Sequence, residues 1–299
     1  MTSFIIINFN TNELTKKCVD SIIKHLPEGS FEIIVVDNDS MKADKERLKE
    51  ELSDKCNILE SKVNLGFGAG NMMGANFANG NFLCFLNSDV ELTEDCITPL
   101  CDYLREHEDV GCITPQQFNA KGNQARSFRH KTGIRHDLFG DSIFQKICPR
   151  KFPDPDQDFN GQNIEVSQIN GSFMLFPSDK FWAVGGFDIN IFLYYEEYDM
   201  GIRMNRMGWK NIVMTKYKFK HIHGATIKNH KSKTKRELYI SKIYTYSKHH
   251  NCFISAIYRL LNIVILSVKP SKWYILKAII HSNTLGQSMR HQVTHLSTK

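Results

Sequence analysis

A short polar stretch at the end of an apolar run is the first place in this sequence where chemistry is expected. Residues 82–86 are Phe-Leu-Cys-Phe-Leu, and Asn87-Ser88-Asp89 follows directly, with a second acid at Glu91. At the carboxyl end of a parallel strand, such side chains face the crevice in which open α/β sheets bind ligands. One or two carboxylates in that place typically bind a hard divalent cation that bridges to phosphates. The alternative is a polar loop in which Asn-Ser-Asp caps the next helix.

The elements that must position these residues are visible in the hydrophobic pattern. Apolar runs of strand length alternate with helical segments, which predicts a parallel sheet with right-handed crossovers. We expect strands at 4–9, 31–36, 57–61, 82–86, 110–115 and 211–214. Helices are expected at 13–25, 42–52, 97–108 and 198–207, with a further helix that ends near residue 78. Regular structure is expected to resume at 169–176. Residues 119–165 read as irregular, and a loop of this length is usually functional or mobile.

The composition is ordinary, but the charge is unevenly distributed. Hydrophobic residues make up 41% and charged residues 23% of the 299 residues, as in a soluble globular protein. The net charge is +6, yet residues 228–299 contain 13 lysines and arginines and a single acid, Glu237, which leaves −6 on residues 1–227. A basic tail on an acidic body indicates an anionic partner for the tail.

The cysteines and the first residues bear on the compartment. None of the eight cysteines forms a C-x-x-C pair, which argues against a zinc site or a disulfide framework and favours a reducing compartment. No basic segment precedes an apolar one at the N-terminus, so we expect no signal peptide.

A glycine-rich stretch precedes the polar strand end. Gly66-x-Gly68-x-Gly70, with Asp89 some way on, is similar to a dinucleotide-binding fingerprint. The third glycine of that fingerprint would fall at Asn71, and the stretch follows the third strand instead of the first, so a Rossmann dehydrogenase is rejected. The glycines would still let the backbone approach a ligand closely at a helix N-terminus.

Taken together, the polar segments resemble the family 2 glycosyltransferases with the GT-A fold, and among them the bacterial rhamnosyltransferase-like enzymes of surface-polysaccharide and O-antigen assembly. The resemblance covers about residues 3–227. It rests on five motifs in the family's order: Asn8-Phe9-Asn10; residues 35–40; residues 64–71; Leu86-Asn87-Ser88-Asp89; and residues 185–188 through 196–199 to His221-x-x-Gly224-x-Thr226. Each motif is weak alone, whereas the ordered set is specific.

The resemblance implies an α/β protein of GT-A fold, with a Rossmann-like, mostly parallel central sheet flanked by helices and a C-terminal helical extension. Residues 1–227 would form the glycosyltransferase domain and residues 228–299 a basic amphipathic helical tail. Asp37, at the end of the second strand, would contact the nucleotide base or ribose, because a carboxylate accepts well from N3–H of uracil or thymine; capping of the next helix is the alternative. The other implied nucleotide-binding residues are Asn8, Asn10, Asn64, Gly66, Asn71, Asn87 and Ser88, although Asn71 would also suit a helix start.

The family's D-x-D metal motif corresponds to Asn87-Ser88-Asp89, with the first acid replaced by Asn. Asp89 is therefore the expected carboxylate ligand of Mg²⁺ or Mn²⁺, and the donor's diphosphate is expected to supply missing ligands. The family's late histidine ligand corresponds to His221, which its spacing to Gly224 and Thr226 favours over His223. A plain polar loop histidine is the alternative.

An acidic pair, Glu196-Glu197, corresponds to the family's acids before a late helix. Inverting transfer needs a base that takes the acceptor hydroxyl's proton as its oxygen attacks C1, and adjacent carboxylates raise each other's pKa. The family's pattern favours Glu197 over Glu196 as the base, and Asp199 would orient the pair or cap the helix. The alternative is that these acids stabilise a helix N-terminus. The acceptor site is expected at Gly171, Gly186, Phe187 and Asp188.

The tail lies outside the resemblance. Residues 228–236 read as a basic linker, followed by two apolar segments at 253–268 and 273–280. Sixteen residues fall short of the roughly 20 needed to span a bilayer, so we expect two amphipathic helices lying on an anionic membrane face. A helical pair packed on the enzyme, or on a second subunit in a homodimer, is the alternative. A nucleic-acid partner is not expected, because no binding motif is present.

These observations predict a metal-dependent inverting glycosyltransferase, cytoplasmic and peripheral to the inner face of the cell membrane. It would move a sugar, with rhamnose from a dTDP donor as the expected case, onto a lipid-linked or saccharide acceptor in surface-polysaccharide synthesis. One alternative is a UDP-hexose-dependent hexosyltransferase. The other is a non-catalytic module that binds a sugar nucleotide or a membrane surface.

Overall fold

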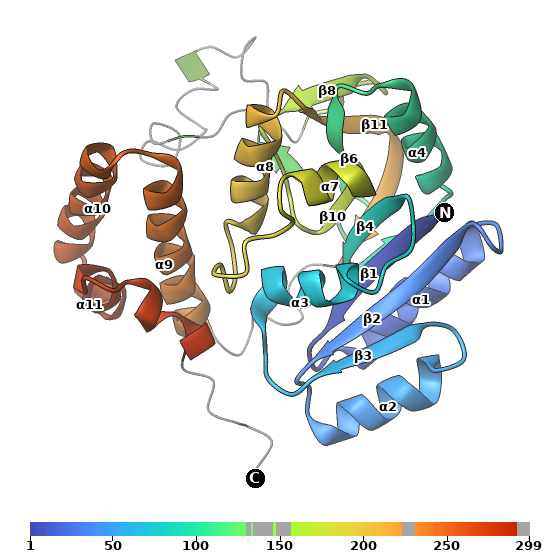
Figure 1. Cartoon of the computed structure of the whole chain (residues 1–299), viewed down its shortest axis with the longest axis horizontal. Helices are drawn as coiled ribbons and strands as arrows, with labels where there is room; N and C mark the ends of the chain where they lie inside the picture. The colour runs from blue at the N-terminus through green and yellow to red at the C-terminus, as the bar shows by residue number, and fades with distance from the viewer. Residues whose placement is uncertain (130–132, 134–145, 148–156, 223–230, 292–299) are drawn as a thin grey trace.

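The computed structural model describes residues 1–129, 133, 146–147, 157–222 and 231–291. A nine-stranded mixed sheet runs through its centre in the order β3-β2-β1-β4-β10-β6-β11-β5, with β8 paired to β11 (Figure 1). The strands are β1 (Thr2–Asn8), β2 (Phe31–Asn38), β3 (Asn57–Ser61), β4 (Phe82–Asn87), β5 (Val90–Leu92), β6 (Val110–Phe118), β8 (Asn163–Val166), β10 (Phe173–Pro177) and β11 (Lys210–His221). A second, two-stranded sheet pairs β7 (Phe128–Arg129) with β9 (Gln168–Ile169).

Helices cover both faces of the central sheet. On one face lie α1 (Asn12–His25), α2 (Lys42–Leu52) and α4 (Ile97–Glu106). On the other lie α3 (Gly66–Ala75), α7 (Ser178–Ala183) and α8 (Glu196–Arg206). Neighbouring residues such as Ile5 and Ile6 are both fully buried, one in each core, which explains why the strands read as continuous apolar runs. The predicted α/β class is therefore confirmed.

The sheet is parallel through β3, β2, β1 and β4 and then becomes mixed. Strand β10 is antiparallel to both β4 and β6, and β5 and β8 are antiparallel to β11. Because Phe173 pairs with Leu86, the start of β10 lies beside the carboxyl end of β4. The polar ends of β1, β2 and β4 therefore share one edge of the sheet with the start of β10 and the ends of β6 and β11. We call this the carboxyl edge.

The glycines of α3 serve packing against the protein itself. Gly66 has φ +79°, and a Cβ there would lie 2.1 Å from the carbonyl oxygen of Phe192. A Cβ on Gly74 would lie 2.5 Å from the Ile5 side chain. The close approach expected for a ligand is thus made by β1 and by the segment before α8.

Replacing Gly66 with alanine is expected to destabilise the fold by about 2–5 kcal/mol, because left-handed backbone strain adds to a steric clash. Gly29 is a matched control, since it has φ +77° but no atom within 4 Å of the position that a Cβ would take. Gly29→Ala should cost about 1–2 kcal/mol, the strain alone. Urea unfolding of both variants measures the difference, and equal losses would contradict the packing role of Gly66.

The C-terminal part forms a group of helices beside α8, comprising α9 (Lys231–His249), α10 (Cys252–Ser267) and α11 (Trp273–Ile280), with short 3₁₀ turns η1 (Pro270–Lys272), η2 (Leu285–Gln287) and η3 (Met289–His291) (Figure 1). The linker predicted at 228–236 is wrong from residue 231 onward, where α9 begins, and residues 228–230 lie outside the described residues. Lysines interleave the apolar positions of α9, which hides its helical period. The helices predicted at 253–268 and 273–280 are present. Among the described helices, none has both the length and the apolar character needed to cross a membrane.

Candidate active site

Asp89 and His221, 132 residues apart, meet at the carboxyl edge. Strand β5 pairs with the end of β11 so that Val90 lies opposite His221. The backbone N–H of Ile222 donates to the Asp89 carbonyl at 2.9 Å, and His221 Nε2 lies 3.0 Å from Asp89 Oδ1. Both side chains are largely buried. The two residues predicted as metal ligands are therefore neighbours, whereas His223 lies outside the described residues.

This pair suits a divalent cation. Two neighbouring ligand atoms of an octahedral ion with bonds of about 2.0–2.1 Å are about 3 Å apart, close to the 3.0 Å observed. Across the described ranges there is no group of three or more His, Cys, Asp or Glu side chains that could hold a metal ion. Asp89 and His221 would therefore be two ligands of such a cation. The described cysteines are all free thiols.

Asn87 and Ser88 lie beside this pair. The Asn87 N–H donates to the Ser172 carbonyl at 3.0 Å, which joins the end of β4 to the start of β10. Ser88 Oγ accepts a hydrogen bond from Thr11 Oγ1 at 3.1 Å. Both side chains are half-buried, so they remain within reach of a ligand at this edge.

The Asp37 carboxylate is fully buried and held by protein groups. It accepts from Asn8 Nδ2 at 3.0 Å and from the Ser40 N–H at 3.3 Å, and Lys45 Nζ lies 3.5 Å away. Helix α2 begins after Met41, so Asp37 does not cap it. Asn8 also contacts Ser40, Asp44, Thr11 and Thr15. We therefore expect Asn8 to position Asp37 instead of touching a nucleotide.

Asn10 and Asn64 shape the adjoining loops. Asn10 has φ +57°, and its Oδ1 accepts from the Met41 N–H at 2.7 Å. Asn64 Oδ1 accepts from the Gly66 N–H at 2.9 Å and from Asn38 Nδ2 at 3.2 Å. Asn38 lies in the motif at residues 35–40 but was not predicted to bind a ligand, and its Oδ1 accepts a hydrogen bond from the Leu65 N–H at 2.8 Å. Its position directly after Asp37 at the end of the strand is the feature of the sequence that could have predicted its role.

Asn71 lies inside α3, so it does not begin the helix. Its Nδ2 donates to the Phe67 carbonyl at 3.1 Å. Its Oδ1 is buried and has no hydrogen-bond partner among the described residues. A buried acceptor without a partner is costly, and a ligand N–H would satisfy it.

The acidic pair opens α8 in an unusual environment. Glu196 is 2% exposed, and its pKa lies well above the usual range because of burial and the adjacent charge of Glu197. Burial also raises the pKa of Glu197, although Arg129 and Gln168, paired across β7 and β9, oppose this rise. Glu197 is half-buried and so is the more accessible carboxyl. Neither Arg129 nor Gln168 was foreseen, since both lie in short strands that the sequence pattern does not reveal.

The residues predicted to bind an acceptor differ in how deeply they are buried. Phe187 is 2% exposed and packs in an aromatic cluster with Phe85 and Phe181 at centroid distances of 4.9 and 5.4 Å. It is a core residue, contrary to the prediction, because large aromatic rings are driven into the interior. Gly186 has φ +66°, and a Cβ there would clash with Met72. Gly171 is half-buried beside the Phe67 ring.

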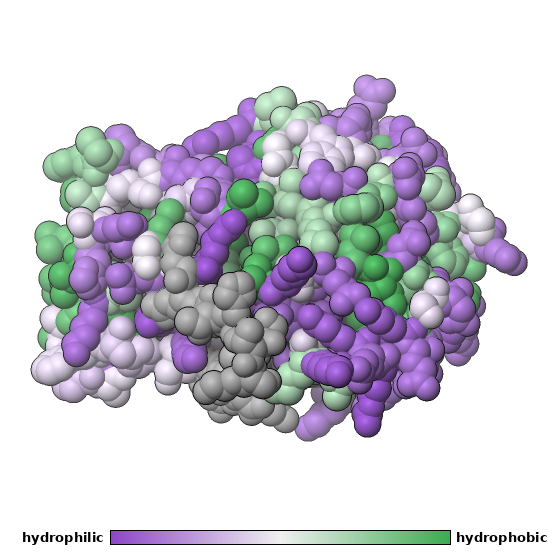
Figure 2. Space-filling view, turned by 60° about the horizontal axis from the view of Figure 1, so that its bottom comes forward, coloured by the Kyte–Doolittle hydropathy of each residue, from purple (hydrophilic) through white to green (hydrophobic). Residues whose placement is uncertain are grey.

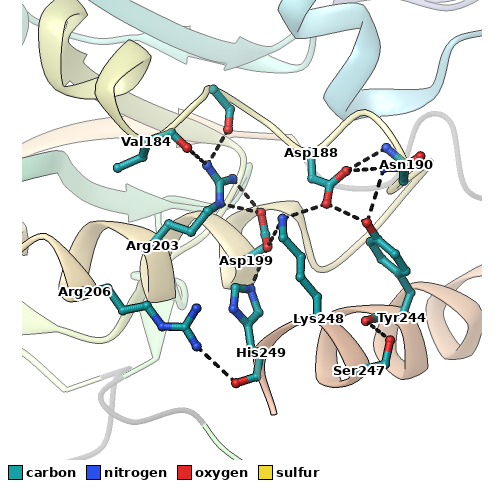
Figure 3. Close-up of polar contacts among 11 residues, drawn as sticks. Val184, Asp188, Asn190, Asp199, Arg203, Arg206, Tyr244, Ser247, Lys248 and His249 are labelled. Carbon is teal, nitrogen blue, oxygen red and sulfur yellow. Dashed lines mark hydrogen bonds and ion pairs between the residues drawn. The ribbon is translucent and has the colours of Figure 1, made fainter. Parts of the chain in front are cut away.

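Asp188 and Asp199 both contact α9. Asp188 accepts hydrogen bonds from Tyr244 and Lys248, and Asp199 contacts Arg203, Lys248 and His249 (Figure 3). Asp199 therefore neither orients the acidic pair directly nor caps α8. Asp188 serves the packing of α9, which leaves its carboxylate mostly occupied by protein groups.

Comparison with known proteins places the chain in a family. The sequence profile of glycosyl transferase family 2 matches residues 3–176, more than half of the chain, and the chain belongs to this family. A low-salt glycan biosynthesis hexosyltransferase, Agl10 of Haloferax volcanii, is 25% identical over 209 residues, which are 68% of this chain and 61% of the relative. Glycosyltransferase GlyA of Streptococcus pneumoniae is 29% identical over 143 residues, 46% of this chain and 19% of GlyA. The chain thus spans less than two thirds of these relatives.

Solved structures share the fold. The Pyrobaculum calidifontis mannosyltransferase PcManGT in complex with GDP-Man and Mn²⁺ has a TM-score of 0.57 at 13% identity, over 94% of this chain and 75% of that one. GalNAc-T7 with UDP, GalNAc and Mn²⁺ has a TM-score of 0.57 at 17% identity, over 83% of this chain and 50% of that one. The predicted GT-A fold is confirmed by these likenesses.

Proposed function

We propose that this protein is a metal-dependent inverting glycosyltransferase that uses a nucleotide-sugar donor. The observation that carries the proposal is the meeting of Asp89 and His221 at 3.0 Å on the carboxyl edge of a family 2 fold. Crevices at this edge are where open α/β sheets bind ligands. Solved structures of the same fold hold GDP-Man or UDP together with Mn²⁺, which supports the choice of donor and metal.

The residues take distinct roles in this proposal. Asp89 and His221 would hold Mg²⁺ or Mn²⁺, which when bound supplies Lewis-acid neutralisation of the leaving diphosphate. Asp37 and Asn71 would bind the nucleoside, with Asn71 Oδ1, which has no partner among the described residues, accepting a ligand N–H. Glu197 would take the proton of the acceptor hydroxyl as that oxygen attacks C1.

Two donors compete in the proposal. Rhamnose from a dTDP donor, for surface-polysaccharide or O-antigen synthesis, follows from the motif resemblance. A UDP-hexose combines the name of the Haloferax relative, a hexosyltransferase, with the UDP bound in the GalNAc-T7 structure. A carboxylate at Asp37 suits either nucleotide, because uracil and thymine present the same N3–H.

A thermal-shift screen separates these donors and tests the proposal. UDP-, dTDP- and GDP-sugars are each added with Mn²⁺ and with chelator. A ligand that binds only the folded state raises the melting temperature, so one nucleotide class should raise it in the presence of Mn²⁺ and much less in chelator. A protein that responds to none of them contradicts the proposed function. Binding of a donor with no measurable hydrolysis or transfer would favour a non-catalytic module.

We further propose that α10 and α11 lie on an anionic membrane surface and bring the site to a lipid-linked acceptor. Figure 2 shows hydrophobic residues at the side of the molecule where Figure 1 places these helices. Along α10 and just past its end, the most exposed are Phe253 at 71%, Leu260 at 59%, Val264 at 55% and Val268 at 73%. Trp273 and Tyr274, residue types that favour a membrane–water interface, continue the surface, which we call the α10 face.

Vesicle sedimentation is expected to detect this contact. The full chain should sediment with phosphatidylserine vesicles and be partly released by high salt, which screens the electrostatic part of the binding free energy. Leu260→Ser/Val264→Ser should weaken sedimentation. Met41→Ser, which removes a side chain that is 73% exposed elsewhere, should not. If the wild-type chain does not sediment with vesicles and the double variant loses the oligomeric state of the wild type, the α10 face is a dimer contact.

A further inference from the structure

Helix α9 binds the segment that carries the acidic pair. Lys248 Nζ lies 2.7 Å from Asp188 Oδ2 and 2.7 Å from Asp199 Oδ1. One ammonium group therefore joins both ends of residues 188–199, which we call the acidic loop and which include the first turn of α8 (Figure 3). Glu196 and Glu197 lie between these two anchors.

Other α9 side chains bind the acidic loop between its ends. The Tyr244 hydroxyl donates a hydrogen bond to Asp188 Oδ2 at 2.9 Å and accepts one from Asn190 Nδ2 at 3.3 Å. Ser241 Oγ donates to the Leu193 carbonyl at 2.9 Å. The contacts extend over successive turns of one helix, so α9 holds the loop along most of its length.

The conformation of the acidic loop needs such support. Tyr194 and Tyr195, immediately before the acidic pair, have φ values of +68° and +74°. Bulky residues rarely adopt this left-handed backbone, and it persists where the surrounding structure enforces it. The Phe192 carbonyl also accepts from the Phe67 N–H at 2.8 Å. The loop is thus held between α3 on one side and α9 on the other.

The anchors remain charged at neutral pH. Burial alone would raise the pKa of Asp199, but the His249 hydrogen bond and the charges of Arg203 and Lys248 lower it to about 2. The pKa of Asp188 is also lowered, because contacts from Lys248, Asn190 and Tyr244 outweigh its burial. Arg203 Nη1 donates hydrogen bonds to the Val184 and Gly186 carbonyls at 2.6 and 2.7 Å. Among the described residues, Lys248 is therefore the cation that links the two carboxylates.

We infer that Lys248 is a positioning residue for sugar transfer, which acts by fixing the acidic loop and hence the reach of Glu197. The inference rests on the proposed function. It also makes α9 part of the catalytic unit, so that the expected division at residue 227 does not separate a complete enzyme from a tail. Because α10 follows α9 after a short turn, the same helix connects the α10 face with the acidic loop.

Three full-length variants test this role. Lys248→Met removes the ammonium but keeps the stem, Lys248→Arg keeps a cation, and Lys233→Met removes an exposed lysine of the same helix as a control. With the nucleotide sugar that gives the largest thermal shift, Lys248→Met should lower kcat for donor hydrolysis at least about tenfold, because misplacement of a catalytic group costs rate, with KM for the donor little changed. Lys248→Arg should restore much of the rate, and Lys233→Met should match the wild type.

Amide hydrogen exchange supplies a readout that does not depend on turnover. Exchange in residues 188–199 should be faster in Lys248→Met than in the wild type and unchanged in Lys233→Met, with the sheet strands equally protected in all. Unchanged exchange would overturn the positioning role, and faster exchange with full kcat would overturn its link to catalysis. A wild type without turnover contradicts the proposed function, while exchange still decides whether Lys248 holds the loop.

Discussion

Asp89→Ala is expected to abolish detectable sugar transfer while the protein stays folded. The carboxylate lies beside His221 at the carboxyl edge, and its loss would leave the charge of the leaving diphosphate uncompensated. Removal of one preorganised electrostatic partner typically costs about 10²–10³ in kcat, and loss of the metal with it should cost more. Turnover at saturating Mn²⁺ measures the loss of transfer, and the melting temperature shows whether the variant stays folded.

Asp102→Ala provides the matched control. Asp102 is a half-exposed acid of α4 that pairs with Arg105, so its loss should leave turnover unchanged. If Asp89→Ala transfers sugar at the wild-type rate in chelator, the metal proposal is wrong.

Glu197→Gln is expected to lower kcat by about 10²–10⁴-fold with little effect on donor binding, because the amide keeps the shape of the side chain but accepts no proton. The pH dependence gives a second signature. Burial raises the pKa of Glu197 above its ordinary value, and only the ionised form can act as a base. Wild-type kcat should therefore fall as the pH drops through that raised pKa, and the residual rate of the variant should lack this fall.

Glu196→Gln distinguishes the two members of the pair. Glu196 is almost fully buried and its pKa is raised well above the usual range, so a neutral amide resembles its protonated form. This variant should retain most of its activity. An inactive Glu196→Gln beside an active Glu197→Gln would show that Glu196 is the base.

The sequence revealed the parts of the site that follow from strand ends. Asp37 and Asp89 each follow an apolar run, and the carboxyl ends of the parallel strands of one sheet share one edge. His221 required the family spacing, because its contact with Asp89 spans 132 residues. The antiparallel direction of β10 was not foreseen, since a strand buried on both faces has the same apolar pattern in either direction.

The contacts between α9 and the acidic loop could not be predicted from the sequence. Lys248 reaches Asp188 and Asp199 from a helix far along the chain, and no local pattern marks a lysine as a bridge. Phe187 and Asp188 were predicted to bind an acceptor because they stand in a recognised motif. In the structure Phe187 fills the core and Asp188 anchors α9, so the spacing of that motif reflects packing at these two positions.

The most direct test of the proposed site is a crystal structure of the full chain soaked with MnCl₂ and UDP or dTDP, with anomalous data collected at the manganese edge. The proposal predicts a single strong anomalous peak within bonding distance of both Asp89 Oδ1 and His221 Nε2, with the diphosphate bound to the same ion and the base near Asp37. A nucleotide bound elsewhere on the molecule, or at this edge with no manganese between Asp89 and His221, would contradict it.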